Sequence, residues 1–300
     1  MECNIILPGK WIDVLALDGA LERSGGPHDS KFNETTIRFC SGSKVMVDAG
    51  ARILSLANQL ASTGSLVSLV FEDGQLGTMG YLNRMGFFDS LSPSIRTIPD
   101  RPLFSGATGT SINLVEFERI SPNNRDETLP SRLADSLESA CSGRPDREAL
   151  GRAAFTIFAE LIDNVFQHSS TLLDGYAALQ VYSNGGKAQV VVSDSGIGIL
   201  ETLRPALQSD RLLKLSDTDL IVEIFREGIS RHGSLRGCGL KESASKAIKY
   251  KAELDVHLPT CSVRLVPSSN GYRPNTAYCQ AGLPLIWGTH ICFYFALDKS

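Results

Sequence analysis

The chain has no excess of positive charge. It carries 29 lysine and arginine residues against 33 aspartate and glutamate residues among 300, for a formal net charge of −4. A protein that binds nucleic acid or an anionic membrane through its overall charge would have the opposite sign. Long apolar runs are also missing: no stretch approaches the roughly 20 residues that cross a bilayer, and residues 1–11 do not resemble a signal peptide. We therefore expect a soluble, cytoplasmic protein.

Paired cysteines are absent as well. The seven cysteines are scattered, odd in number, and include no Cys-x-x-Cys pair. This disfavours a disulfide framework and a structural zinc site, and it favours a reducing compartment. The remaining composition, with 42% hydrophobic and 21% charged residues, is that of an ordinary globular protein. A chain of this length has two domains as its default expectation.

The first hundred residues alternate between strand-like and helical patterns, which predicts a small α/β unit. Prolines and glycines gather in residues 92–109, so we place the domain boundary there and define domains at 1–105 and 106–300. In the first domain we predict strands at 37–40, 44–47 and 66–71 and helices at 49–61 and 75–91.

The second domain has a different order of elements, but it is also α/β. Helices are predicted at 129–142, 146–168, about 217–230 within an irregular stretch from 199 to 236, and 240–251. Strands are predicted at 112–120, 176–183, 188–194, 253–258, 262–266 and 289–297. The two central strands flank a hairpin turn at 184–186, and residues 267–288 are predicted as a long loop.

One predicted helix carries polar residues of the types that take part in catalysis and metal binding. Glu160, Asn164 and His168 are spaced four residues apart, so they share one face of the helix. A carboxylate and an amide one turn apart could place a water molecule and a divalent ion side by side. The alternative is the solvated polar face of an ordinary amphipathic helix.

A second segment, residues 190–199, runs from an apolar strand into Asp194, Gly196 and Gly198. An aspartate at a strand end can accept hydrogen bonds from an exocyclic amine, and glycines let a ligand approach the backbone closely. The same residues are also common in simple turns.

A third segment, residues 228–241, is rich in glycine and basic residues and precedes a predicted helix. Backbone N–H groups at such a position form an anion site. Residues 226–251 contain seven lysines and arginines against two glutamates, although basic residues on a helix are usually just solvated. The same stretch leaves DNA binding open as an alternative, which a salt-dependent shift with duplex DNA would test. Neither the dinucleotide-binding nor the Walker A pattern fits.

In combination and in this order, the three segments resemble the GHKL ATPase superfamily, whose ATP-binding unit is the Bergerat fold. The resemblance spans about residues 110–297 and includes Gly288-Thr289 before the last strand. It implies an α/β sandwich whose mixed sheet is covered by helices on one face. The family includes gyrase-type topoisomerases, ATP-driven chaperones, mismatch-repair ATPases and histidine kinases.

The resemblance also implies roles for individual residues. Glu160 would be the general base, and Asn164 would hold Mg²⁺ through its side-chain oxygen. Asp194 would accept from the adenine amine, helped by Thr289. The residues implied around the adenine and the phosphates of ATP are Gly196, Gly198, Gly233, Arg236, Gly237, Gly239, Leu240 and Lys241. Residues 199–236 would form a lid over ATP. Lys241 stands where many members have a third glycine, and the role of His168 is left open.

Within the family, glutamate at position 160 resembles the hydrolysing members and the anti-sigma-factor serine kinases. Residues 35–92 loosely resemble a STAS-like domain, a regulatory partner of those kinases. Phosphorylated relatives carry a serine near the helix start, where this chain has residues 48–51, Asp-Ala-Gly-Ala, so phosphorylation there is doubtful. The usual histidine kinase type is disfavoured because His28 is the only histidine before residue 146.

Two functions stay open from the sequence. The first is a nucleotide-dependent signalling module that hydrolyses ATP or phosphorylates a protein serine or threonine, with a regulatory protein partner. The second is a binding or scaffold protein that responds to ATP with negligible catalysis. Many relatives dimerise, so a homodimer is a further expectation.

Overall fold

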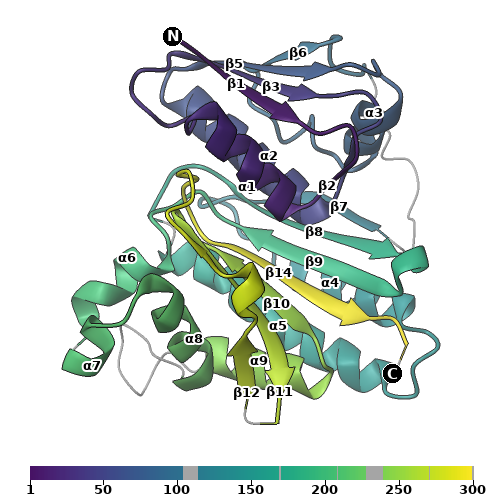
Figure 1. The fold of residues 1–300 in the computed structure, drawn as a ribbon. Helices are drawn as coiled ribbons and strands as arrows, with labels where there is room; N and C mark the ends of the chain where they lie inside the picture. Colours follow the sequence, from purple (N-terminus) through teal and green to yellow (C-terminus); the bar gives the residue numbers. More distant parts are fainter. Residues whose placement is uncertain (104–113, 169, 208, 228–238, 270, 299–300) are drawn as a thin grey trace.

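The computed structural model describes residues 1–103, 114–168, 170–207, 209–227, 239–269 and 271–298. These residues form an α/β protein with four layers, in the order sheet, helices, sheet, helices (Figure 1). The N-terminal sheet lies at one end of the stack. The second sheet, built from the C-terminal two thirds of the chain, lies between two helical layers.

The N-terminal sheet consists of four parallel strands in the order β1-β3-β5-β6. A separate two-stranded ribbon pairs β2 with β4. The helices that connect the strands include α1 and α2, which lie between the two sheets (Figure 1). The elements are β1 Glu2–Leu7, β2 Trp11–Ile12, α1 Val14–Ser24, β3 Glu34–Phe39, β4 Lys44–Val45, α2 Val47–Ser62, β5 Leu66–Phe71, α3 Gly77–Arg84 and β6 Arg96–Ile98.

Several predictions for the N-terminal domain were wrong in detail. The predicted helix at 75–91 is the shorter α3, which ends at Arg84 and is followed by Gly86 at a φ of +68°. Glycine takes this left-handed conformation without strain, and it typically ends a helix. β6, which completes the first sheet, lies within the boundary segment 92–109 and inside the predicted first domain. Residue 105, where the domains are divided, lies outside the described residues. β1, β2 and α1 were not predicted.

The second sheet has the order β12-β11-β10-β14-β9-β8-β7, with β13 beside β11. Its described strand pairs are all antiparallel, so the expectation of a mixed sheet was wrong. The short hairpins β8-β9 and β10-β11 require antiparallel neighbours, and β14 inserts antiparallel to both β9 and β10. The strands are β7 Leu114–Ile120, β8 Gly175–Tyr182, β9 Lys187–Ser193, β10 Glu253–His257, β11 Cys261–Ser268, β12 Gly271–Pro274, β13 Gln280–Ala281 and β14 His290–Ala296. The predicted loop at 267–288 therefore contains β12 and β13.

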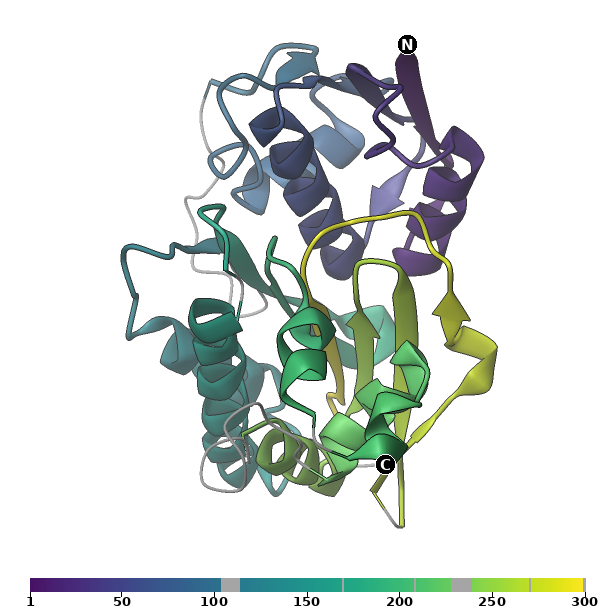
Figure 2. The ribbon, with the colours of Figure 1, turned by 90° about the vertical axis from the view of Figure 1, so that its left-hand side faces the viewer.

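Helices cover one face of the second sheet (Figure 2). They are α4 Leu129–Ala140, α5 Arg147–His168, α8 Asp217–Glu227 and α9 Gly239–Lys249, with the short helices α6 Ile199–Leu203 and α7 Asp210–Leu213 nearby. The predictions of α4, α5 and α9 are confirmed to within two residues. None of the helices in the described part of the chain is both long and apolar enough to span a membrane.

The other face of the second sheet is covered by α2. The helix is buried on all sides from Val47 to Leu60 because it lies between the two sheets. Its apolar residues form one core with residues of the second sheet, among them Ala178 and Val191. The two domains thus share a core, and helices cover both faces of the second sheet rather than one.

Candidate functional site

Glu160 of α5 lies directly against the first residue of α9. A Cβ atom built on Gly239 would collide with Glu160 Oε2 and would lie 2.8 Å from its Cδ. Glycine therefore leaves room for the carboxylate at this helix N-terminus. Burial, followed by the nearby Asp163 and Glu242 carboxylates, raises the pKa of Glu160 above its usual value. A half-buried carboxylate with a raised pKa is suited to accept a proton from a reacting group.

Asn164 follows one turn later on α5 and is half-buried. Its side-chain oxygen is a ligand type that Mg²⁺ accepts. The neighbouring Asp163 is paired instead with Arg125, at 2.6 Å. Glu160 and Asn164 therefore lie on the predicted polar face of α5. The side chain of His168 lies outside the described residues.

Asp194 and Thr289 hold two segments together at the end of β9. The Thr289 N–H donates to Asp194 Oδ2 at 3.2 Å, and the Asp194 N–H donates to the Thr289 carbonyl at 3.0 Å. The Gly196 N–H donates to Asp194 Oδ1 at 2.7 Å, and Thr289 Oγ1 accepts from the Ile199 N–H at 3.0 Å. Burial raises the pKa of Asp194 to about 6, although these backbone hydrogen bonds oppose the shift. The carboxylate is fixed in place and almost completely buried.

Two glycines make this arrangement possible. Gly288 has a φ of +99°, and a Cβ atom there would overlap the Asp194 carbonyl group. Gly198 has a φ of +85°, and its Cβ would lie 2.9 Å from Pro259 Cδ. Positive φ and close backbone approach are the two conditions that demand glycine. The predicted Gly198 is therefore required by the loop itself.

The Glu160–Asn164 pair and the Asp194–Thr289 pair lie at the same end of the second sheet. Gly175, the first residue of β8, is so tightly enclosed that an added Cβ would lie 2.9 Å from Val165 Cγ1 and 2.8 Å from the Ser193 carbonyl. Val165 follows Asn164, and Ser193 precedes Asp194. The structure thus places α5, the end of β9 and the start of α9 around one end of the sheet.

A cavity of about 580 Å³ borders the segment from Ser195 to Gly198. Its walls include Leu200, Pro259 and Trp287, so it is partly apolar with polar groups at its edge. This size is typical of sites for small molecules. Its described lining does not include Glu160, Asn164 or Asp194.

The predicted phosphate segment is described only in part. Gly233, Arg236 and Gly237 lie outside the described residues. Gly239 and Leu240 open α9; Leu240 is buried in the main core, and Lys241 is exposed. The predicted lid at 199–236 includes α8, but its apolar residues Leu220, Ile221, Ile224 and Phe225 are buried in the core, which argues against α8 as a moving part.

Sequence reasoning missed the residues of α2 that contact this region. Asp48, Arg52, Ser55 and Gln59 form a stripe at helical spacing and are all buried against the second sheet. Ser55 Oγ lies 3.2 Å from Ser193 Oγ, and the Gln59 side chain bonds to Ser195. The stripe is visible in the sequence, but polar residues at helical spacing normally predict a solvated face rather than a buried contact.

No protein-family model matches the chain. A 4,4'-diapolycopene oxygenase from Methylomonas sp is 31% identical over 124 residues, which make up 40% of this chain and 24% of that protein. The chain therefore spans about a quarter of the length of the curated relative that it matches.

Proposed function

We propose that the chain is an ATP-binding module of the GHKL type that hydrolyses ATP or phosphorylates a protein serine or threonine as a signalling switch. The observation that carries the proposal is the convergence of three distant segments at one end of the second sheet. Glu160 of α5 contacts Gly239 at the start of α9, and Val165 of α5 and Ser193 at the end of β9 both enclose Gly175. These are the segments whose sequences resemble the family motifs.

The adenine end of the site would be built on Asp194. Its carboxylate is buried and held by backbone N–H groups, yet each carboxylate oxygen can accept more than one hydrogen bond. An exocyclic amine is therefore an appropriate partner. Thr289 and the backbone of Gly196 and Gly198 would border the base.

The phosphate end would be built on α5 and α9. The exposed N–H groups at the start of a helix favour anions, so the residues from Gly239 onward would bind phosphate oxygens, with Lys241 adding positive charge. The Asn164 side-chain oxygen would hold Mg²⁺, which supplies charge neutralisation for the phosphates.

Glu160 would act on the attacking group. As a water or hydroxyl oxygen bonds to the γ-phosphorus, the carboxylate accepts its proton, and the bond from the γ-phosphorus to the bridging oxygen breaks to release ADP. The raised pKa of Glu160 brings it closer to neutral pH, which favours general base catalysis. The STAS-like N-terminal domain would be the regulatory element, with a protein partner and a homodimer as further parts of the proposal.

The test is turnover by the intact chain with ATP and Mg²⁺. We expect phosphate release, or transfer of label to a protein serine or threonine, and we expect Glu160→Ala to abolish it while nucleotide binding persists. Glu148→Ala, an exposed glutamate in the first turn of α5, is the matched control and should retain activity. Binding without turnover in the unaltered protein would favour an ATP-responsive scaffold instead. Equal turnover in Glu160→Ala and the unaltered protein would exclude Glu160 as the base.

A further inference from the structure

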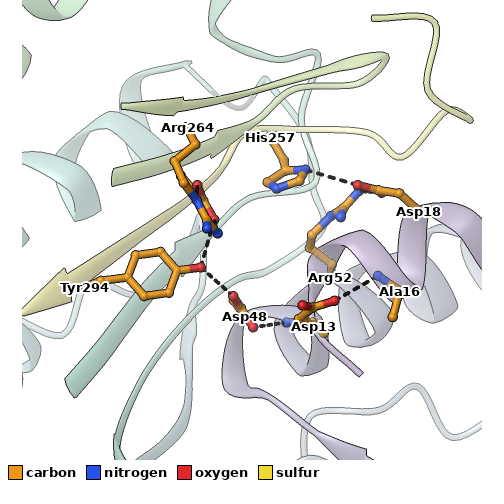
Figure 3. Close-up of polar contacts among 10 residues, drawn as sticks. Asp13, Ala16, Asp18, Asp48, Arg52, His257, Arg264 and Tyr294 are labelled. Atoms are coloured by element: carbon orange, nitrogen blue, oxygen red, sulfur yellow. Dashed lines mark hydrogen bonds and ion pairs between the residues drawn. The ribbon is translucent and has the colours of Figure 1, made fainter. Parts of the chain in front are cut away.

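The helix α2 is fixed to the second sheet by polar contacts along its length. At its first turn Asp48 Oδ2 lies 2.9 Å from the Tyr294 hydroxyl of β14 (Figure 3). In its middle Arg52 pairs at 2.7 Å with Asp18 of α1, and Asp18 Oδ2 lies 3.7 Å from Nδ1 of His257 on β10. These side chains are buried between the two domains. Buried polar contacts of this kind fix one relative position of two surfaces, because each group needs its particular partner.

At the other end of α2, Gln59 uses the full hydrogen-bonding capacity of its amide. Its Nε2 donates to Ser195 Oγ at 3.1 Å and to the Trp287 carbonyl at 3.0 Å. Its Oε1 accepts from the Trp287 N–H at 3.0 Å and lies 3.2 Å from His28 Nε2. The side chain is fully buried. The orientation of the amide is fixed because the Trp287 N–H can only donate and its carbonyl can only accept.

The partners of Gln59 belong to the two segments that hold Asp194. Ser195 is the residue after Asp194, and Trp287 precedes Gly288 and Thr289, whose backbone bonds to the Asp194 carboxylate. His28, also from the N-terminal domain, stacks on Trp287 with a centroid distance of 4.7 Å. One side chain of the N-terminal domain therefore ties together both loops at the candidate adenine pocket.

We propose that Gln59 is a positioning residue of the nucleotide site, through which the docked N-terminal domain sets the selectivity of that site for the adenine amine. The inference rests on the proposed function and extends it. Loss of the amide removes the Gln59 partner of the Trp287 N–H and leaves the Trp287 carbonyl with His290 Nε2 alone, at 3.2 Å, so the loop from Trp287 to Thr289 shifts relative to Ser195. The Asp194 carboxylate then loses its alignment with the amine, whereas contacts to the phosphates are unaffected.

The experiment compares binding of ATP with that of purine riboside triphosphate, which lacks the exocyclic amine, by calorimetric titration in Mg²⁺. Gln59→Met keeps the side-chain volume and removes all four hydrogen bonds. We expect it to weaken ATP binding by about tenfold, within the range typical of coupled sites, and to leave the analogue's affinity unchanged. The matched control is Asn58→Leu. Asn58 is buried on the same helix and bonds to Tyr176 of the second sheet, but it has no bond to either loop.

The outcomes separate this inference from the proposed function. Unaltered protein that binds no ATP overturns both. If the unaltered protein binds ATP, two results overturn the role of Gln59 alone. One is that Gln59→Met weakens the binding of ATP and of the analogue equally. The other is that Gln59→Met and Asn58→Leu have equal effects on ATP binding. If Gln59→Met does not fold, His28→Phe keeps a ring over Trp287 and removes one bond to Gln59; it should reduce the preference for ATP in the same direction, and an unchanged preference would refute the proposal.

Discussion

Asp48 at the start of α2 and Tyr294 on β14 meet across the domain interface, with the Tyr294 hydroxyl 2.9 Å from Asp48 Oδ2. The same hydroxyl lies 2.8 Å from Asp255 Oδ2, and Asp255 also pairs with Arg264. A single hydroxyl proton cannot serve two carboxylates at once. We infer that a second proton resides on Asp48, whose pKa is raised chiefly by burial.

This arrangement predicts how stability depends on pH. The pKa of Asp48 is raised in the folded protein, so its stabilising contribution is complete below the unfolded pKa and is lost as pH rises through the folded one. The side chain introduced by Asp48→Asn does not titrate, so this variant does not lose that stability as pH rises. The free energy of unfolding of the variant, relative to the unaltered protein, should therefore increase from pH 4.5 to pH 7.5 in urea titrations.

Asp73→Asn is the control for this prediction. Asp73 is exposed, and hydrogen bonds from Ser41 and Gly42 lower its pKa. Its contribution is present at neutral pH and is lost as pH falls, so its trend has the opposite sign and is small because the group is solvated. A relative stability of Asp48→Asn that stays flat or falls with rising pH would contradict the inferred proton.

Gly288 predicts a severe and specific effect of an added methyl group. Gly288→Ala combines left-handed strain, about 1–2 kcal/mol, with overlap against the Asp194 carbonyl. Gly271→Ala is a matched control, because Gly271 has a φ of +107° but no atom of the described residues lies within 4 Å of its Cβ position. Gly288→Ala should lower the free energy of unfolding by clearly more than Gly271→Ala. Equal losses would show that the close approach to Asp194 has no energetic consequence.

Gly239 allows a test of the position of Glu160. Gly239→Ala would place a methyl group where Glu160 Oε2 lies, so the flexible carboxylate must move while the helix remains intact. We expect a loss of phosphate release of tenfold or more with a small change in melting temperature. Ser245→Ala, at an exposed position on α9, should change neither. Normal turnover in Gly239→Ala would argue against a catalytic position for Glu160.

Asp194 predicts a pH dependence of nucleotide affinity. Its pKa is raised to about 6, so the carboxyl is increasingly protonated as pH falls through 6 and accepts hydrogen bonds less well. The ATP affinity of the unaltered protein, divided by that of Asp194→Asn, should fall between pH 7.5 and pH 5. This ratio cancels the protonation of ATP itself. A ratio independent of pH would contradict contact between Asp194 and the base.

The sequence was sufficient for the parts of the fold that follow simple periodicity. α5 and α9 have one apolar face toward the sheet, and their predicted bounds agree with the structure to within two residues. The closeness of Glu160 to the start of α9 could not be derived from spacing alone. It came from the resemblance of the motifs, because contacts between distant segments leave no local pattern.

The interface of the two domains was not predictable in the same way. Asp48, Arg52 and Gln59 lie on one stripe of α2, and such a stripe normally indicates a solvated face. Here the opposite surface is also polar: Tyr294 bonds to Asp48, and Ser195 bonds to Gln59. His257 lies beside the Arg52–Asp18 pair, although its Nδ1 has no hydrogen-bond partner among the described residues. Reciprocal polar burial is a tertiary property, and either sequence segment alone predicts exposure.

The central claim is that the segments at the end of the second sheet bind ATP through Asp194. Calorimetric titration of ATP with Mg²⁺ into the intact chain, beside Asp194→Asn, tests it most directly. We predict saturable binding at one site per chain and an affinity at least tenfold lower in Asp194→Asn, because an amide presents a donor to the adenine amine. No heat of binding in the intact chain, or equal affinities in the two proteins, would contradict the account.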